Sequence, residues 1–117
     1  MQSTTLLRDF EFSAISQRLG KMLRAVGDMR RGPRKMSVEC AMVFLAIGER
    51  GVTRSGAGLA IRPVSCADIA GLLEIPRETV RRRAMSLADK GLVSVSARGV
   101  MIESLPEWRR LAEALLQ

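Results

Sequence analysis

The chain has 117 residues, of which 47% are hydrophobic and 26% are charged, as expected for one globular domain. Only 3% are aromatic, so the core must be aliphatic, and the net charge is +7. Histidine is absent and the two cysteines, Cys40 and Cys66, lie far apart, which argues against a zinc site and a secreted disulfide framework. We interpret Cys40 as a core residue and Cys66 as a small residue in the first turn of a helix.

The sequence contains no recognisable catalytic constellation. Without histidine it lacks the commonest general base, and it has no paired-carboxylate signature, phosphate loop or nucleophile motif. Its apolar runs are too short to span a bilayer, and its N-terminus has no signal-peptide pattern. We therefore expect a cytoplasmic protein that is not an enzyme, with no metal, no cofactor and no membrane association.

Residues 3–29 are predicted to be helical. Ile15, Leu19, Met22 and Val26 recur at helical spacing and form one apolar stripe. Ser13 is a suitable N-cap for this part, with a shorter turn before it. We interpret the stripe as core or dimer interface.

Residues 30–35, RRGPRK, end this helix because Gly32 and Pro33 break helical structure. Their basic residues supply more than half of the net charge and are Arg30, Arg31, Arg34 and Lys35. A short basic linker is usually only solvated, but beside a nucleic-acid module these residues become candidate phosphate contacts.

Residues 37–49 are apolar on most sides and are predicted to form the central buried helix, capped by Ser37. Residues 52–64 follow as a hairpin around the turn SGAG, whose glycines suit a tight reversal.

Two helices are predicted at residues 65–73 and 76–90. Ser65 and Asp68 form a capping box before the first, and Pro76 suits the first helical position of the second. Gly91 follows its end.

The segment LVSVSARGVMIE alternates in period two around ARG and is predicted to be a second hairpin. Residues 104–117 form the last predicted helix, with a capping box of Ser104 and Glu107. Its apolar stripe includes Trp108 and Leu115, and like the first stripe it is core or interface.

The predicted order of helix, hairpin, helix, tight turn, helix and hairpin is that of a winged helix-turn-helix, a mainly α fold with α+β character. In this motif the second helix of the pair enters the major groove. At about 100° per residue, Val80, Ala84 and Leu87 face inward, and Glu78 and Arg82 point nearly opposite. A purely structural alternative is an exposed face in which Glu78 and Arg82 form an i,i+4 ion pair.

The strand before VSCADIAGLL, the string RETVRR, the segment LADKGLV and the basic tip ARG give a specific resemblance. Through them, residues 36–104 resemble the C-terminal DNA-binding domain of the cyclic-AMP receptor protein and FNR family. The resemblance implies that Arg77, Glu78 and Arg82 contact base edges, which suits their hydrogen-bonding chemistry. It implies phosphate contacts for Ser65 and Arg98. We expect further phosphate contacts from their neighbours Thr79, Arg81 and Arg83.

The sequence also departs from that family. Glu74 stands where the family has a glycine, so we expect it to adopt the left-handed αL conformation. Arg83 replaces a usually apolar residue, and Met85 is apolar where the helix should be exposed. The cyclic-nucleotide-binding region of the family has no counterpart in residues 1–35, so no small-molecule ligand is predicted.

These observations divide the chain into an N-terminal helical segment and linker for dimerisation (1–35), a DNA-binding domain (36–104) and a C-terminal helix (105–117). The expected dimer interface comprises Ile15, Leu19, Met22, Val26, Trp108 and Leu115. The expected function is a dimeric transcriptional regulator that binds specific double-stranded DNA, with residues 76–90 in the major groove and the wing on phosphates. Two alternatives stay open: a protein-interaction module, either an adaptor or an anti-activator, and a plasmid or phage replication initiator.

Overall fold

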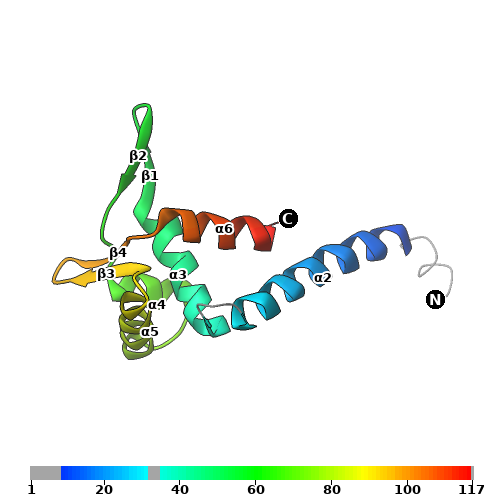
Figure 1. The fold of residues 1–117 in the computed structure, drawn as a ribbon, viewed down its shortest axis with the longest axis horizontal. Helices are drawn as coiled ribbons and strands as arrows, with labels where there is room; N and C mark the ends of the chain where they lie inside the picture. The colour runs from blue at the N-terminus through cyan, green and yellow to red at the C-terminus, as the bar shows by residue number, and fades with distance from the viewer. Residues whose placement is uncertain (1–8, 32–34, 117) are drawn as a thin grey trace.

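In a computed structural model, residues 9–31 and 35–116 are described, and they form five helices and two antiparallel hairpins (Figure 1). The elements are α2 (Asp9–Arg31), α3 (Val38–Gly51), β1 (Val52–Ser55), β2 (Gly58–Ile61), α4 (Cys66–Leu73), α5 (Arg77–Asp89), β3 (Val93–Ser96), β4 (Gly99–Ile102) and α6 (Leu105–Leu116). The prediction of a mainly helical α+β fold is confirmed. None of the described helices is both long enough and apolar enough to cross a membrane.

Helix α3 is the centre of the body, as predicted, and packs against α4, α5, α6 and β4. Ser37 caps it, because its Oγ accepts a hydrogen bond from the backbone N–H of Cys40 at 3.1 Å. Most of its residues are buried, which confirms Cys40 as a core residue. The helix continues to Gly51, two residues beyond the predicted end.

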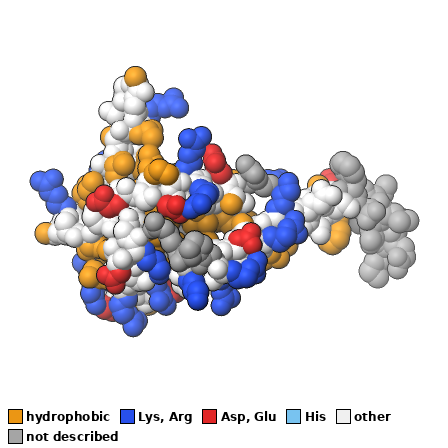
Figure 2. Space-filling view, in the orientation of Figure 1, with side chains coloured by type: hydrophobic (Ala, Val, Ile, Leu, Met, Phe, Trp, Pro, Cys, Tyr) orange, Lys and Arg blue, Asp and Glu red, His pale blue; other side chains and the backbone are white. Residues whose placement is uncertain are grey.

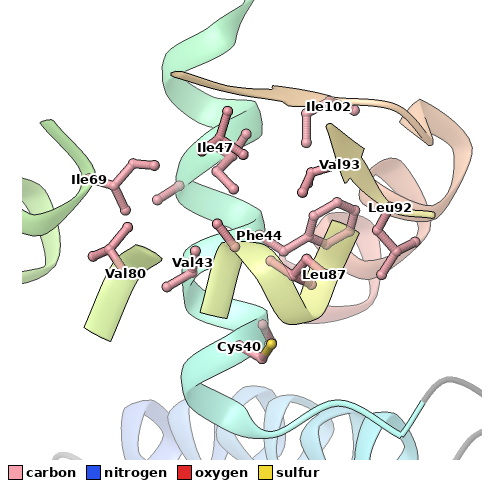
Figure 3. Close-up of a cluster of buried hydrophobic side chains, with 14 of the residues drawn as sticks. Cys40, Val43, Phe44, Ile47, Ile69, Val80, Leu87, Leu92, Val93 and Ile102 are labelled. Atoms are coloured by element: carbon pink, nitrogen blue, oxygen red, sulfur yellow. The ribbon is translucent and has the colours of Figure 1, made fainter. Parts of the chain in front are cut away.

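The core around α3 is aliphatic apart from Phe44. Figure 3 shows Ile69 and Val80 on one side of α3 and Leu92, Val93 and Ile102 on the other. The inward face of α5 is the predicted one, since Val80, Ala84 and Leu87 are all buried.

The two hairpins have matching registers but different surroundings. Strands β1 and β2 pair from Val52 with Ile61 to Ser55 with Gly58 and project from the body, with most of their residues exposed (Figure 1). Strands β3 and β4 pack against α5 and α3 respectively. Strand β4 is joined near its turn to the segment before α4, because Val64 and Val100 exchange backbone hydrogen bonds of 2.9 and 2.8 Å.

Helix α2 is continuous from Asp9, so the prediction that Ser13 caps a later start was wrong. Ser13 is an acceptable N-cap, but no breaker in residues 9–12 ends the preceding turn, and the helix runs through it. The helix extends away from the body (Figure 1), which makes the molecule 58 Å long and 28 Å thick.

The connection between α4 and α5 is tight. Glu74 has φ 55° and ψ 48°, so the predicted αL conformation is confirmed. Pro76 is the N-cap of α5 and not its first helical residue, which corrects the prediction. Its ψ of 142° is extended, while its carbonyl already accepts the first helical bond from Val80, and both features define an N-cap.

The strained turn gives a stability prediction. Replacing Glu74 by glycine removes an αL penalty of about 1–2 kcal/mol, against an unfolded-state entropy cost of about 0.4–1 kcal/mol. We expect Glu74→Gly to raise the free energy of unfolding by about 1 kcal/mol in urea denaturation. Glu74→Ala is the matched control, because it removes the same exposed carboxylate but keeps Cβ. Equal stability of the glycine and alanine variants would contradict strain at this position.

Helix α6 is attached to α3 by Trp108. The indole Nε1–H donates to the carbonyl oxygen of Leu45 at 3.2 Å. The ring lies directly over Gly48, where an added Cβ would be only 2.1 Å from Nε1. Gly48 is therefore required for this close approach.

This contact predicts that Gly48→Ala expels the Trp108 ring and destabilises the protein by about 1–3 kcal/mol, the usual cost of overpacking. Gly71→Ala is a matched control in α4, because its Cβ meets no neighbour within 4 Å. That change should be neutral or stabilise by up to about 1 kcal/mol through helix propensity. Urea unfolding followed by fluorescence of Trp108, the single tryptophan, measures both. A Gly48→Ala protein as stable as the Gly71→Ala protein would disprove the contact.

Candidate nucleic-acid interface

The exposed face of α5 carries the residues predicted to contact bases. Arg77 and Glu78 lie in its first turn, and Arg81 and Arg82 follow, all with exposed side chains. Arg77 and Arg82 form no ion pair with any described residue, so both guanidinium groups are available to a ligand. The helix N-terminus favours the Glu78 carboxylate, because the backbone dipole is positive there.

Glu78 pairs with Arg81 and not with Arg82, so the alternative i,i+4 pairing was wrong. The Nε of Arg81 donates to both carboxylate oxygens at 3.0 and 3.2 Å, and Nη2 donates to Oε2 at 2.6 Å. Hydrogen bonding from Arg81 lowers the pKa of Glu78 below the ordinary glutamate value, because it stabilises the ionised carboxylate. Because both side chains are exposed, the pair contributes little to stability.

Arg83 is held against α3. Its guanidinium pairs with Glu39 at 2.7 Å, and its carbonyl oxygen accepts a 3.8 Å contact from the thiol of Cys40. The predicted phosphate contact Arg83 therefore has its charge matched by Glu39 within the chain. Sequence reasoning missed Glu39, because a contact between residues so far apart in the sequence leaves no local pattern.

Three further candidates surround α5. The Ser65 Oγ accepts from the N–H of Asp68 at 3.1 Å, so Ser65 caps α4 as predicted. Thr79 is half-buried in the first turn of α5. Arg98 is exposed at the β3–β4 turn, where its backbone N–H donates to the Ser96 Oγ at 3.2 Å. The Arg98 guanidinium has no ion-pair partner among the described residues.

Basic side chains gather along the edge of the molecule that α4 and α5 form, with a few acidic ones between them (Figure 2). The turn of the β3–β4 hairpin projects beside this edge (Figure 1). The site therefore combines one exposed helix face and one basic hairpin tip, which are attached to the same core.

The basic linker is described only in part. Arg30 and Arg31 close α2, and Arg31 pairs with Asp28 at 2.7 Å. Lys35 is exposed, whereas Arg34 lies outside the described residues.

The predicted dimer residues do not all lie together. Ile15, Leu19, Met22 and Leu115 line a hollow of about 310 Å³ between α2 and α6, together with Arg18 and Leu116. Val26 is half-buried further along α2. Trp108 does not join them, because it packs on α3 as described above.

The apolar stripe on α2 is longer than the sequence reasoning recognised, because Phe12 and Met29 extend it. Its members alternate at spacings of three and four residues and form what we term the α2 seam: Phe12, Ile15, Leu19, Met22, Val26 and Met29. This alternation is the heptad signal that could have revealed it. The side chains of Phe12, Ile15 and Leu19 are 67%, 62% and 50% exposed, whereas Met29 packs against the core.

No protein-family model matches the chain, and no curated protein matches it. Among solved structures, the X-ray crystal structure of the YusO protein from Bacillus subtilis is similar, with a TM-score of 0.57 and 14% sequence identity. The match covers 97% of this chain and 74% of that chain. At this identity the similarity concerns the fold alone.

Proposed function

We propose that this protein is a homodimeric transcriptional regulator that binds specific double-stranded DNA through a winged helix-turn-helix. Helices α4 and α5 form the helix-turn-helix, α5 enters the major groove, and the β3–β4 hairpin is the wing. The observation that carries the proposal is the exposed side of α5. Arg82 points away from the buried residues Val80, Ala84 and Leu87, and Arg77 lies at the edge of the first turn. Both arginines are exposed and have no ion-pair partner among the described residues.

The geometry of this face suits base recognition. Arg77 and Arg82 are separated by about 7.5 Å along the helix and by about 140° around it, so they can reach different base pairs. Each guanidinium can donate two hydrogen bonds to O6 and N7 of a guanine. Between them, Glu78 can accept a hydrogen bond from the amino group of cytosine or adenine.

Phosphate binding comes from outside the recognition face. Arg98 at the wing tip is positioned for the sugar–phosphate backbone, and Arg30 and Lys35 of the linker are exposed. Ser65 and Thr79 can donate hydroxyl hydrogen bonds to phosphate oxygens. Such contacts orient the protein on any sequence, because phosphates occur at every position.

This division of roles predicts different effects for two arginines. Arg82→Ala should cost about 1–3 kcal/mol on the preferred duplex and relax preference at one base pair. Arg98→Ala should weaken binding to all duplexes by a similar factor and reduce the magnitude of the salt slope by about 1. Both variants are titrated on the preferred and a scrambled duplex over a series of salt concentrations, after the preferred sequence has been selected from random DNA.

Two outcomes would count against the proposal. If Arg82→Ala and Arg98→Ala weaken both duplexes equally, α5 does not discriminate between sequences. If selection at physiological salt enriches no DNA sequence, a protein-interaction module becomes the better explanation.

The homodimer is supported by the α2 seam. A strict heptad stripe packs against another helix by interdigitating its side chains. Helix α6 meets α2 and lines the hollow beside Ile15, Leu19 and Met22, but these three residues remain exposed, and so does Phe12. A second copy supplies a helix of the same length and pattern. A dimer also presents two recognition helices, which together make twice as many base contacts as one.

We expect a dimer at micromolar concentration by light scattering, and we expect Leu19→Glu to convert it to a monomer because a buried, unpaired carboxylate is costly. Gln17→Glu is the matched control, because it adds the same charge to the opposite face of α2. A wild-type protein that is monomeric both with and without DNA refutes the dimer, and a monomeric Gln17→Glu protein refutes the interface.

A further inference from the structure

We infer that Arg81 is a positioning residue for Glu78, so that the two side chains act as one unit in setting the base preference at one position of the DNA site. This inference rests on the proposed function. It departs from the expectation that Arg81 contacts a phosphate.

The geometry of the pair carries the inference. Three hydrogen bonds connect the Arg81 guanidinium to both oxygens of Glu78, at 2.6, 3.0 and 3.2 Å. Neither side chain is buried, so no surrounding packing fixes the carboxylate. Arg81 is therefore the one described group that restricts where the Glu78 carboxylate points.

The remaining capacity of the carboxylate suits a base edge. An ionised carboxylate only accepts hydrogen bonds and has about four acceptor positions. Arg81 engages both oxygens through two N–H groups, with the single Nε hydrogen shared between them, so acceptor positions remain free for a base. Among the bases, the major-groove donors are the N4 amino group of cytosine and the N6 amino group of adenine. A carboxylate oriented before binding loses less side-chain freedom when such a donor arrives.

The ion pair also reduces the repulsion between the Glu78 carboxylate and the DNA phosphates. A lone carboxylate brought into the major groove is repelled by the phosphates on both sides. Arg81 places a positive charge within hydrogen-bonding distance of it, so the unit enters the groove without net charge. Arg77 and Arg82, which have no ion-pair partner among the described residues, then retain their full charge for the DNA.

The Glu78→Gln variant first identifies the base pair at which sequence preference depends on Glu78. Arg81→Lys and wild type are then compared on two duplexes that differ only at that base pair. Lysine keeps the positive charge but lacks the planar fork that engages both oxygens. Discrimination between the duplexes should fall about three- to tenfold, the effect of releasing one ordered side chain, with an unchanged salt slope. In a Glu78→Gln background, Arg81→Lys should cause no further loss of discrimination.

Arg109→Lys is the matched control, because Arg109 forms a comparable exposed pair with Glu113 on α6, away from α5. It should leave both affinities unchanged. In the free protein, an NMR titration of the Glu78 carboxyl should show its pKa rising toward the ordinary value in Arg81→Ala, since the hydrogen bonds that lower it are gone.

Two DNA-binding results overturn the inference while leaving the proposed function intact. One is wild-type discrimination by the Arg81→Lys protein. The other is a uniform loss of affinity with a smaller salt slope in Arg81→Ala, which would identify Arg81 as a phosphate contact. An unchanged Glu78 pKa in Arg81→Ala would overturn it without any DNA. If wild type itself binds all duplexes equally, the proposed function has failed, and the inference fails with it.

Discussion

The burial of one face of α5 against α3 is the constraint on which the rest of the molecule depends. Val80, Ala84 and Leu87 have almost no exposed surface and meet a helix that is itself buried on most sides. Because a helix repeats every 3.6 residues, this packing decides which side chains can face outward. It leaves Arg77, Glu78, Arg81 and Arg82 in solvent and brings Arg83 to Glu39. The same buried residues therefore set both the stability of the domain and the orientation of its charged face.

Features that depend on local chemistry could be predicted from the sequence. The Ser37 and Ser65 caps and the inward face of α5 each follow from residue type and spacing over a few positions, whereas the αL conformation of Glu74 was expected from the family resemblance. The choice of Arg81 over Arg82 as the partner of Glu78 could not be predicted, because i,i+3 and i,i+4 neighbours both lie within reach on a helix surface. Nor could the Glu39–Arg83 pair, which depends on the packing of two whole helices. Trp108 shows the same limit. The apolar stripe that contains it was predicted, but the packing of its ring over Gly48 was not.

Helix α6 connects two parts of the molecule that the sequence suggested were separate. Through Trp108 it is attached to α3, and through Leu115 it reaches the hollow beside α2. The long helix is thus joined to the body both by the chain that follows it and by this second contact. On the proposed arrangement, α3 and α6 support both the dimer interface and the DNA-binding surface. The relative placement of the two recognition helices in a dimer therefore depends on the packing of α6 against α3.

Under the proposed function, the paired hydrogen bonds between Val64 and Val100 have a consequence for DNA shape. They join the turn end of strand β4 to the segment shortly before α4, and Gly99 allows the close backbone approach that they need, since a Cβ there would lie 2.5 Å from the carbonyl oxygen of Val64. The distance between the tip of the β3–β4 hairpin and α5 is thereby fixed. A duplex whose groove does not match this fixed distance must deform in order to bind both elements. The energetic cost of that deformation varies with base sequence, so selectivity would extend to base pairs that no side chain touches.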